Sequence, residues 1–306
     1  MTNNDAAPQS DIWSDWLLHV RHGGDPEYSR AMRGRLEYYA DRVLDGARLA
    51  AGMTLADIGA GEGLIAFRAF ERIGPSLRVV FTDVSAPMLR HAEALAADRG
   101  VRGQCVFHHC AADELKDIDA GSVDVVATRA VLAYVADKRA ALREFHRILK
   151  PGGRMSLAEP ILRDEALAVS VLKTIVDSRP PEHAERVLPL MHRWRAAQFP
   201  DTPDKIAANP ITNFGERDLV QLAQVSGFAE IHMEFHIDVL PFSITSWETF
   251  LGSSPHPWAK PLSTILKEQF TAEERQILEQ ALRQAIAAPK SVTIERIAYL
   301  TATKPA

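Results

Sequence analysis

The sequence contains only two cysteines, Cys105 and Cys110, among its 306 residues. They lie five positions apart on one predicted strand, so we expect their side chains to point to opposite faces and not to form a disulfide. Two thiols are too few for a zinc or arsenic site built from three clustered thiolates, and we predict no metal site. A reducing cytoplasm is the simplest setting for such a chain.

Long apolar runs and an excess of basic residues are also missing. No apolar run approaches the ~20 residues that a membrane span requires, and the start "MTNNDAAPQSD" has neither the positive nor the apolar part of a secretory signal. We therefore expect a cytoplasmic protein without a membrane partner. The formal net charge of -5 disfavours a nucleic-acid partner, because binding nucleic acid requires a basic surface that displaces counterions.

What the sequence does contain is an alternation of strands and helices. Apolar stretches at 54–58, 78–83, 104–109, 122–128 and 154–160 read as strands, and helical patterns separate most of them. Strands and helices that alternate at this spacing predict right-handed crossovers and a mostly parallel sheet. In such a sheet, ligands bind at the carboxyl ends of the strands.

Two insertions and an N-terminal segment surround this pattern. We predict a core of residues 51–160 and 211–304, an N-terminal helical lid at 1–50, a helical substrate cap at 161–210 and a second helical insertion at 241–290. In the second insertion, Thr271 and Glu274 have the spacing of a helix capping box. Long connections inside a compact domain are usually functional, so we expect them to enclose a small-molecule substrate. The second insertion could instead form the surface of a homodimer.

The chemistry of the sequence centres on residues 57–63, Asp-Ile-Gly-Ala-Gly-Glu-Gly, between a strand and a helix. A dinucleotide loop of the form G-x-G-x-x-G would need a small residue where Leu64 stands, and Glu62 would repel a diphosphate. S-adenosylmethionine has no phosphate, and its sulfonium and ammonium groups would be attracted by Asp57 and Glu62. Asp83, which ends the second strand, is placed to bind the ribose hydroxyls of either cofactor.

Several stretches of residues 54–160 resemble the core of class I S-adenosylmethionine-dependent methyltransferases. They are the glycine motif "ADIGAGEG", the ribose-acid stretch "FTDVSAPML" and the segment "SVDVVATRAVLAYVADKRAALREFHRILKPGG", which is similar to the ubiquinone/menaquinone-type and small-molecule members. "VSGF" and "AYLTATKP" resemble the final elements of that fold. The resemblance implies a Rossmann-like, doubly wound α/β fold, with a mostly parallel seven-stranded sheet and an antiparallel last strand. It also implies methyl transfer from S-adenosylmethionine to O, N, C or S of a small molecule, with S-adenosylhomocysteine as the product.

The cofactor-binding residues that this resemblance implies follow the matched motifs. They are Asp57, Gly59, Ala60, Gly61, Gly63, Asp83, Val84, Met88, Ala112, Asp113, Arg129 and Ala130. The family often has Asp-Ala after the third strand, whereas this chain has Ala111 and Ala112, so Asp113 or a backbone group would meet the adenine amino group. Arg129 is a candidate partner for the methionine carboxylate, because a guanidinium group matches a carboxylate geometrically. The alternative is an arginine on the surface.

For the substrate side we predict a pocket that includes Tyr28, Tyr134, His183, His192 and Trp194. An amphipathic helix with a solvated basic face is the ordinary alternative for the segment around Trp194. Glu159 ends the fifth strand and is the candidate general base, or it caps the following segment. In the lid, Gly23 and Gly24 predict a bend, and Arg21 is a further candidate contact.

Three alternatives to a small-molecule methyltransferase remain open on the sequence. An NAD(P)-dependent oxidoreductase would share Asp83 but not suit Glu62 and Leu64. A non-catalytic S-adenosylmethionine-binding scaffold would keep the loop without turnover. An RNA methyltransferase is disfavoured by the acidic balance and by the lack of a basic tail.

Overall fold

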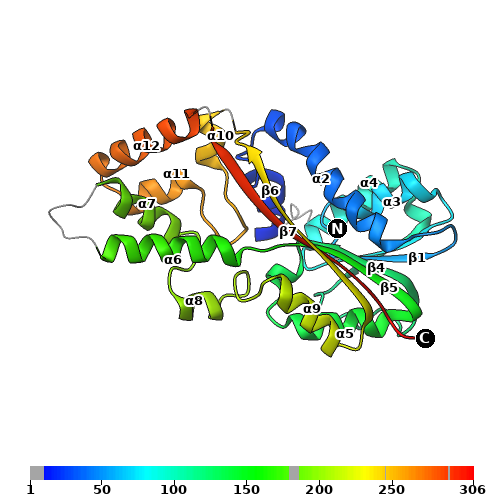
Figure 1. Cartoon of the computed structure of the whole chain (residues 1–306). Coiled ribbons are helices and arrows are strands. Elements are labelled where there is room, and N and C mark those ends of the chain that lie inside the picture. The colour runs from blue at the N-terminus through cyan, green and yellow to red at the C-terminus, as the bar shows by residue number, and fades with distance from the viewer. Residues whose placement is uncertain (1–9, 179–185, 245, 289) are drawn as a thin grey trace, which may run out of the picture.

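A computed structural model describes residues 10–178, 186–244, 246–288 and 290–306. Its seven strands form one sheet in the order β3-β2-β1-β4-β5-β7-β6 (Figure 1). The strands are β1 (Thr54–Ile58), β2 (Arg78–Asp83), β3 (Cys105–His109), β4 (Val123–Arg129), β5 (Leu149–Pro160), β6 (Ala229–Pro241) and β7 (Val292–Thr303). The first five strands are parallel, and β7 runs antiparallel to both β5 and β6. The predicted Rossmann-like, mostly parallel seven-stranded sheet is therefore confirmed.

Helices cover both faces of this sheet. The helices α2 (Pro26–Ala47), α3 (Leu64–Ile73) and α4 (Ala86–Asp98) pack on one face, and α5 (Lys138–Ile148) and α9 (Glu216–Val225) pack on the other. Successive side chains of a strand point to opposite faces of the sheet. Leu55 therefore packs in the apolar layer with α2, α3 and α4, and Ala56 packs in the layer with α5 and α9. The two apolar layers hold the strand ends in place, and the site lies at those ends.

The two predicted insertions contain most of the remaining helices. Residues 161–210 hold α6 (Arg163–Asp177), α7 (Val187–Ala196) and α8 (Pro203–Ala208); residues 241–290 hold α10 (Trp247–Gly252), α11 (Leu262–Gln269) and α12 (Ala272–Ala287). Figure 1 shows α6, α7, α10, α11 and α12 gathered at one end of the molecule, where the long strands β6 and β7 reach them. The capping box of α12 is present, with Thr271 and Glu274 each bonding the other's backbone N–H. Among the described helices, none is both long and apolar enough to cross a membrane.

The N-terminal segment is helical, with a sharp bend where the two glycines predict one. A short helix, α1 (Ile12–Asp15), continues into a π-helical turn, η1 (Trp16–Val20), and α2 follows after the bend. Gly23 and Gly24 have φ angles of 64° and 70°, a backbone conformation that glycine adopts without strain. A Cβ on Gly23 would lie 2.4 Å from the carbonyl oxygen of Thr249, so this bend is pressed against α10.

Two local expectations need adjustment. The fifth strand begins at Leu149, earlier than the predicted 154–160, because Leu149 already pairs with Val123 before the chain loops out and resumes pairing at Arg154. Cys110 lies just beyond β3 rather than on it. Both Cys105 and Cys110 are free thiols.

Candidate active site

The glycine loop joins β1 to α3 in a conformation that depends on its glycines. Gly59, Gly61 and Gly63 have φ angles of 62°, 55° and 80°. A Cβ on Gly59 would lie 2.5 Å from Val131 Cγ2, and one on Gly63 would lie 2.5 Å from Phe67 Cε2. The loop therefore combines left-handed backbone with close packing, which leaves its backbone accessible from the cavity side.

Two buried carboxylates accept hydrogen bonds from the loop and from the helix that follows it. Asp57 Oδ2 accepts a hydrogen bond from the N–H of Ala66 in the first turn of α3, at 3.1 Å. Asp83 Oδ2 accepts from the N–H of Gly61 at 2.8 Å, and its Oδ1 accepts from the N–H of Ser85 at 2.8 Å. Burial raises the pKa of Asp57 to about 7 and also raises the pKa of Asp83. A cation nearby would reverse both shifts.

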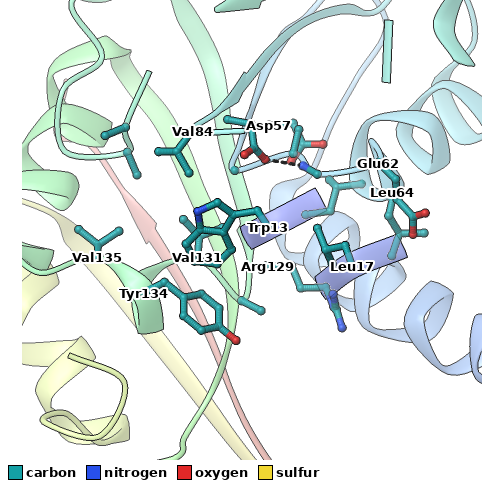
Figure 2. Close-up of a pocket in the computed structure, with 18 of the residues that line it drawn as sticks. Trp13, Leu17, Asp57, Glu62, Leu64, Val84, Arg129, Val131, Tyr134 and Val135 are labelled. Carbon is teal, nitrogen blue, oxygen red and sulfur yellow. Dashed lines mark hydrogen bonds between the residues drawn. The ribbon is translucent and has the colours of Figure 1, made fainter. Parts of the chain in front are cut away.

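A cavity of about 280 Å³ opens beside the loop, at the carboxyl ends of β1, β2 and β4. Figure 2 shows Trp13 near the centre of this cavity, with Val84 and Asp57 on one side and Tyr134 on the other. All of the predicted cofactor-binding residues line it except Gly63 and Met88: Asp57, Gly59, Ala60, Gly61, Asp83, Val84, Ala112, Asp113, Arg129 and Ala130. Residues predicted from separate motifs thus meet at one site.

Gly63 and Met88 support the site without lining the cavity. Gly63 precedes α3 and packs against Phe67 and Phe81, where a side chain would not fit. Met88 is completely buried in the first turn of α4, and its N–H donates to Ser85 Oγ at 3.2 Å. Both residues hold helix starts beside the loop, and their contact with the cofactor stays a prediction.

Glu159 is placed differently from the predicted general base. Its side chain is fully buried and does not line the cavity. Oε1 accepts hydrogen bonds from the N–H groups of Val131 and Leu132 at 3.0 and 3.1 Å, and Oε2 accepts from that of Ala133 at 3.1 Å. Burial raises the pKa of Glu159, while these three bonds act in the opposite direction. The carboxylate caps the short 3₁₀ helix η3 (Leu132–Tyr134), which forms one wall of the cavity.

Of the predicted substrate residues, only Tyr134 lines the cavity. Trp194 is buried in the separate apolar core of the insertions, and His192 Nε2 lies 3.2 Å from Asp201 Oδ2. Tyr28 lies outside the cavity, with its hydroxyl 3.4 Å from Ser243 Oγ. The apolar face of α7 packs on α11 and α12, as the amphipathic alternative expects, but Arg193 and Arg195 form ion pairs with Glu274 and Glu165 instead of a solvated basic face. His183 lies outside the described residues.

The lid supplies Arg21, a candidate contact from the sequence, and three residues that were not predicted to line the site. Trp13, Trp16, Leu17 and Arg21 all line the cavity. Trp13 shares a helical face with Trp16 and Leu17 at i+3 and i+4, and that spacing is the signal that could have identified it. From the core, the analysis also did not predict Val131, which follows β4 and contacts the glycine loop.

The lid is held at both ends. Near its start, Ser85 Oγ donates to Asp11 Oδ1 at 3.0 Å, which links the lid to the N-terminus of α4. At its bend, Thr249 Oγ1 of the second insertion donates to Asp25 Oδ2 at 2.6 Å. Between these ties, Trp16 Nε1 donates to the carbonyl of Ser254 at 3.3 Å. Segments far apart in the sequence thus meet over the cavity.

The charged side chains around the cavity fit a ligand that carries both positive and negative groups. Carboxylates come from Asp57, Glu62, Asp83 and Asp113, and guanidinium groups come from Arg21 and Arg129. S-adenosylmethionine carries a sulfonium, an ammonium and a carboxylate, so both kinds of side chain have a counterpart. A diphosphate would be repelled by the acids on the loop side, as the position of Glu62 in the sequence already indicates.

Comparisons with known proteins point in the same direction. A family model described as a methyltransferase domain matches residues 49–199. Nocamycin O-methyltransferase of Saccharothrix syringae is 34% identical over 218 residues, which cover 70% of this chain and 71% of that protein. A ubiquinone/menaquinone biosynthesis C-methyltransferase of Cellvibrio japonicus (strain Ueda107) is 32% identical over 117 residues, 38% of this chain and 47% of that one. A tRNA 5-carboxymethoxyuridine methyltransferase of Escherichia coli (strain K12) is 36% identical over 105 residues, 34% of this chain and 39% of that one.

A solved structure supports the fold over a longer stretch. The YcgJ protein of Bacillus subtilis, at 17% identity, aligns with a TM-score of 0.55 over 88% of this chain and 99% of its own. The matched motifs, the family model and the extended similarity to the nocamycin enzyme leave the oxidoreductase alternative without support. The chain belongs to the class I S-adenosylmethionine-dependent methyltransferases.

Proposed function

We propose that this protein methylates a small molecule enclosed between the glycine-loop side of the core and the N-terminal lid. The observation that carries the proposal is the convergence of lid and core residues on one cavity, with Trp13 and Arg21 on the lid and Asp83 and Arg129 on the core. A macromolecular substrate would need an open approach, whereas here the lid is tied down on both sides of the cavity. The relatives named for nocamycin and for ubiquinone/menaquinone biosynthesis are consistent with a small acceptor.

We assign the core residues to cofactor binding. Asp83 would accept from the ribose hydroxyls with the oxygen lone pairs that its two backbone bonds leave free. Asp57 and the glycine-loop backbone would hold the positively charged amino-acid end, and Arg129 would pair with its carboxylate. Ala112 and Asp113 would border the adenine ring. When bound, S-adenosylmethionine supplies a methyl group whose bond to sulfur breaks, with its electron pair returning to sulfur.

The chain's main contribution to rate would be orientation and exclusion of water. Well-oriented reactants can gain ~7–11 kcal/mol from positioning alone, more than the ~3–5 kcal/mol of a typical general base. The aromatic side chains of Trp13 and Tyr134 line the acceptor side of the cavity. Glu159 would act as a positioning residue, because it fixes the backbone of η3 that carries Tyr134.

Binding measurements separate this proposal from its alternatives. Isothermal titration calorimetry should show tight binding of S-adenosylhomocysteine and none of NAD(H) or NADP(H). Methyl transfer should then appear as production of S-adenosylhomocysteine from S-adenosylmethionine when extracts of small molecules are added, and not when tRNA is added. Binding of S-adenosylhomocysteine without turnover on any extract would support a non-catalytic scaffold, and turnover on tRNA alone would contradict the small-molecule proposal.

A further inference from the structure

Two arginines face the same cavity, one from the lid and one from the core. Arg21 follows η1, and Arg129 ends β4. Within the part of the chain that the structure describes, neither guanidinium group hydrogen-bonds to or forms an ion pair with an acidic side chain; each lies near an aromatic ring instead. Arg21 lies 5.6 Å from the ring centroid of Trp16, and Arg129 lies 5.5 Å from that of Tyr39.

This pair of charges is costly in the absence of anions. Burial lowers the pKa of Arg21, although the nearby charge of Glu62 opposes that effect. Burial also lowers the pKa of Arg129 to about 10, and the positive charge of Arg21 is the next largest cause. Two desolvated cations in one cavity favour ligands that bring two negative groups. S-adenosylmethionine has one carboxylate, which leaves one cation for the methyl acceptor.

Position indicates which arginine remains for the acceptor. Arg129 ends β4, and Val131, two residues further on, packs against Gly59 of the glycine loop, so we assign Arg129 to the cofactor side. Arg21 belongs to the lid, and its charge affects the pKa of the Tyr134 hydroxyl more than any other charged group does. Arg21 and Tyr134 both line the cavity, and Arg21 reaches it from the lid rather than from the core.

Trp13 and Tyr134 line the cavity, and both rings contact a third ring, that of Trp258. Trp13 and Tyr134 have centroids 5.2 Å apart in an edge-to-face arrangement. Trp258, from the second insertion, lies 6.1 Å from Trp13 and 5.7 Å from Tyr134, again edge to face. Rings arranged in this way present flat faces and edges to a ligand, which favours a planar conjugated acceptor.

The described residues that line the cavity also offer no obvious base for that acceptor. Asp57 bonds to an amide of α3 and Asp83 to one of the loop, and we assign Glu62 and Asp113 to the cofactor. Burial raises the pKa of Tyr134 to about 12, so its hydroxyl stays protonated at neutral pH. Glu159 is turned toward the backbone of η3. An acceptor that is already an anion needs no base.

We propose that the methyl acceptor is an oxyanion on a flat conjugated scaffold, held by Arg21 against the rings of Trp13 and Tyr134. Enolates, acidic phenolates and aromatic carboxylates belong to this class. The acceptor oxygen donates a lone pair to the new carbon–oxygen bond, the carbon–sulfur pair returns to sulfur, and no proton is released. This inference rests on the proposed function, because it assigns the substrate class of the same site.

The test compares matched acidic and neutral probes on protein saturated with S-adenosylhomocysteine. The pairs are 4-hydroxycoumarin with coumarin, 4-nitrophenol with 4-nitroanisole, and 2-naphthoate with 2-naphthamide, each titrated by calorimetry at neutral pH. A hydrogen-bonded charge contributes ~1.5–3 kcal/mol, so we expect the acidic member of at least one pair to bind about 10-fold or more tightly. Arg21→Gln should remove that preference, and Arg21→Lys should keep part of it.

Two controls make the outcomes distinguishable. Arg30→Gln removes an exposed arginine of α2 that does not line the cavity, and it should leave the preference unchanged. Affinity for S-adenosylhomocysteine should be retained in Arg21→Gln, which shows that the variant is folded. A preference that is absent in the unmodified protein, or that survives Arg21→Gln, would overturn the oxyanion proposal. Failure of the unmodified protein to bind S-adenosylhomocysteine would contradict the proposed function instead.

Discussion

The carboxylate of Glu159, at the end of β5, accepts a hydrogen bond at 3.0 Å from the backbone N–H of Val131, which follows the end of β4. The same side chain bonds to the next two amides, so one buried acid holds the turn that carries Tyr134 and packs on the glycine loop. Each prediction below tests a contact of this kind.

Glu159→Gln should destabilise the protein without removing a catalytic base. Glutamine has one acceptor oxygen, so a buried N–H of η3 would lose its partner, at a cost of about 1–3 kcal/mol. We expect a lower melting temperature and weaker substrate binding, with the pH dependence of turnover unchanged in shape. A general base would behave differently, because its loss removes a limb of the pH–rate profile.

Asp83→Ala should sharply weaken cofactor binding while the protein stays folded. The substitution removes the proposed ribose acceptor and also the side-chain partner of Gly61 N–H. Charge-assisted hydrogen bonds of ~1.5–3 kcal/mol predict a loss of about 10- to 100-fold in affinity for S-adenosylhomocysteine. Calorimetry measures the affinity, and far-UV circular dichroism checks the fold. Unchanged affinity would contradict the ribose assignment.

Asp57 should make cofactor affinity depend on pH. Burial raises its pKa to about 7, and a bound cation favours the ionised form. Affinity for S-adenosylmethionine should therefore rise as the pH increases toward about 7 and level off above it, because Asp57 releases its proton on binding. In Asp57→Asn this rise should disappear. A slope that persists in the variant would assign the titration to another group.

The raised pKa of Asp57 should also make the stability of the unliganded protein depend on pH. Stability should fall as the pH rises, whereas cofactor affinity should increase. The pKa of Asp57 is higher in the folded state than the ordinary value of 3.8, so folding favours the protonated form. The stabilising contribution is complete below pH ~4 and is lost as the pH rises to about 7. Asp57→Asn should thus raise the melting temperature at pH 8 and change it little at pH 4, as differential scanning calorimetry would measure.

Gly59→Ala tests whether the loop needs both its backbone conformation and its close packing. Gly59 and Gly121 have φ angles of 62° and 65°, but a Cβ would meet Val131 Cγ2 at 2.5 Å only at Gly59, and nothing within 4 Å at Gly121. Gly121→Ala should cost about 1 kcal/mol from strain, whereas Gly59→Ala should cost ~1–3 kcal/mol more and abolish cofactor binding. Adding Val131→Ala should recover part of the lost stability; no recovery would mean that packing is not the cause.

Adjacent glycines offer the same kind of control for the lid. A Cβ at Gly23 would meet the Thr249 carbonyl oxygen at 2.4 Å, whereas at Gly24 the nearest atom lies 3.5 Å away. Gly23→Ala should push the lid from α10, weaken S-adenosylhomocysteine binding and increase proteolysis near the bend. Gly24→Ala shares the backbone strain and should show a smaller effect. Equal effects in both variants would assign the loss to strain rather than to the contact with α10.

The sequence by itself determined the sheet, the glycine loop and the position of Asp83 at a strand end, because their signals are local. Strand and helix periods set the order of the elements, and the ends of parallel strands meet at one edge. Asp57, Asp83 and Arg129 could therefore be placed together without coordinates. The net charge and the two cysteines led us to expect no nucleic-acid partner and no metal site for similarly simple reasons.

Only the tertiary structure decided what faces the cavity. Glu159 ends a strand as expected, but the neighbouring turn of β4 lies over its carboxylate and turns it from a candidate base into a cap. Trp194 and His192 look suited to a pocket, yet α7 packs against α11 and α12 and draws Trp194 into their core. Trp13 and Arg21 enter the site because bonds to Ser85 and Thr249 hold the lid across it. The two lid contacts join residues 74 and 224 positions apart, and no local pattern encodes them.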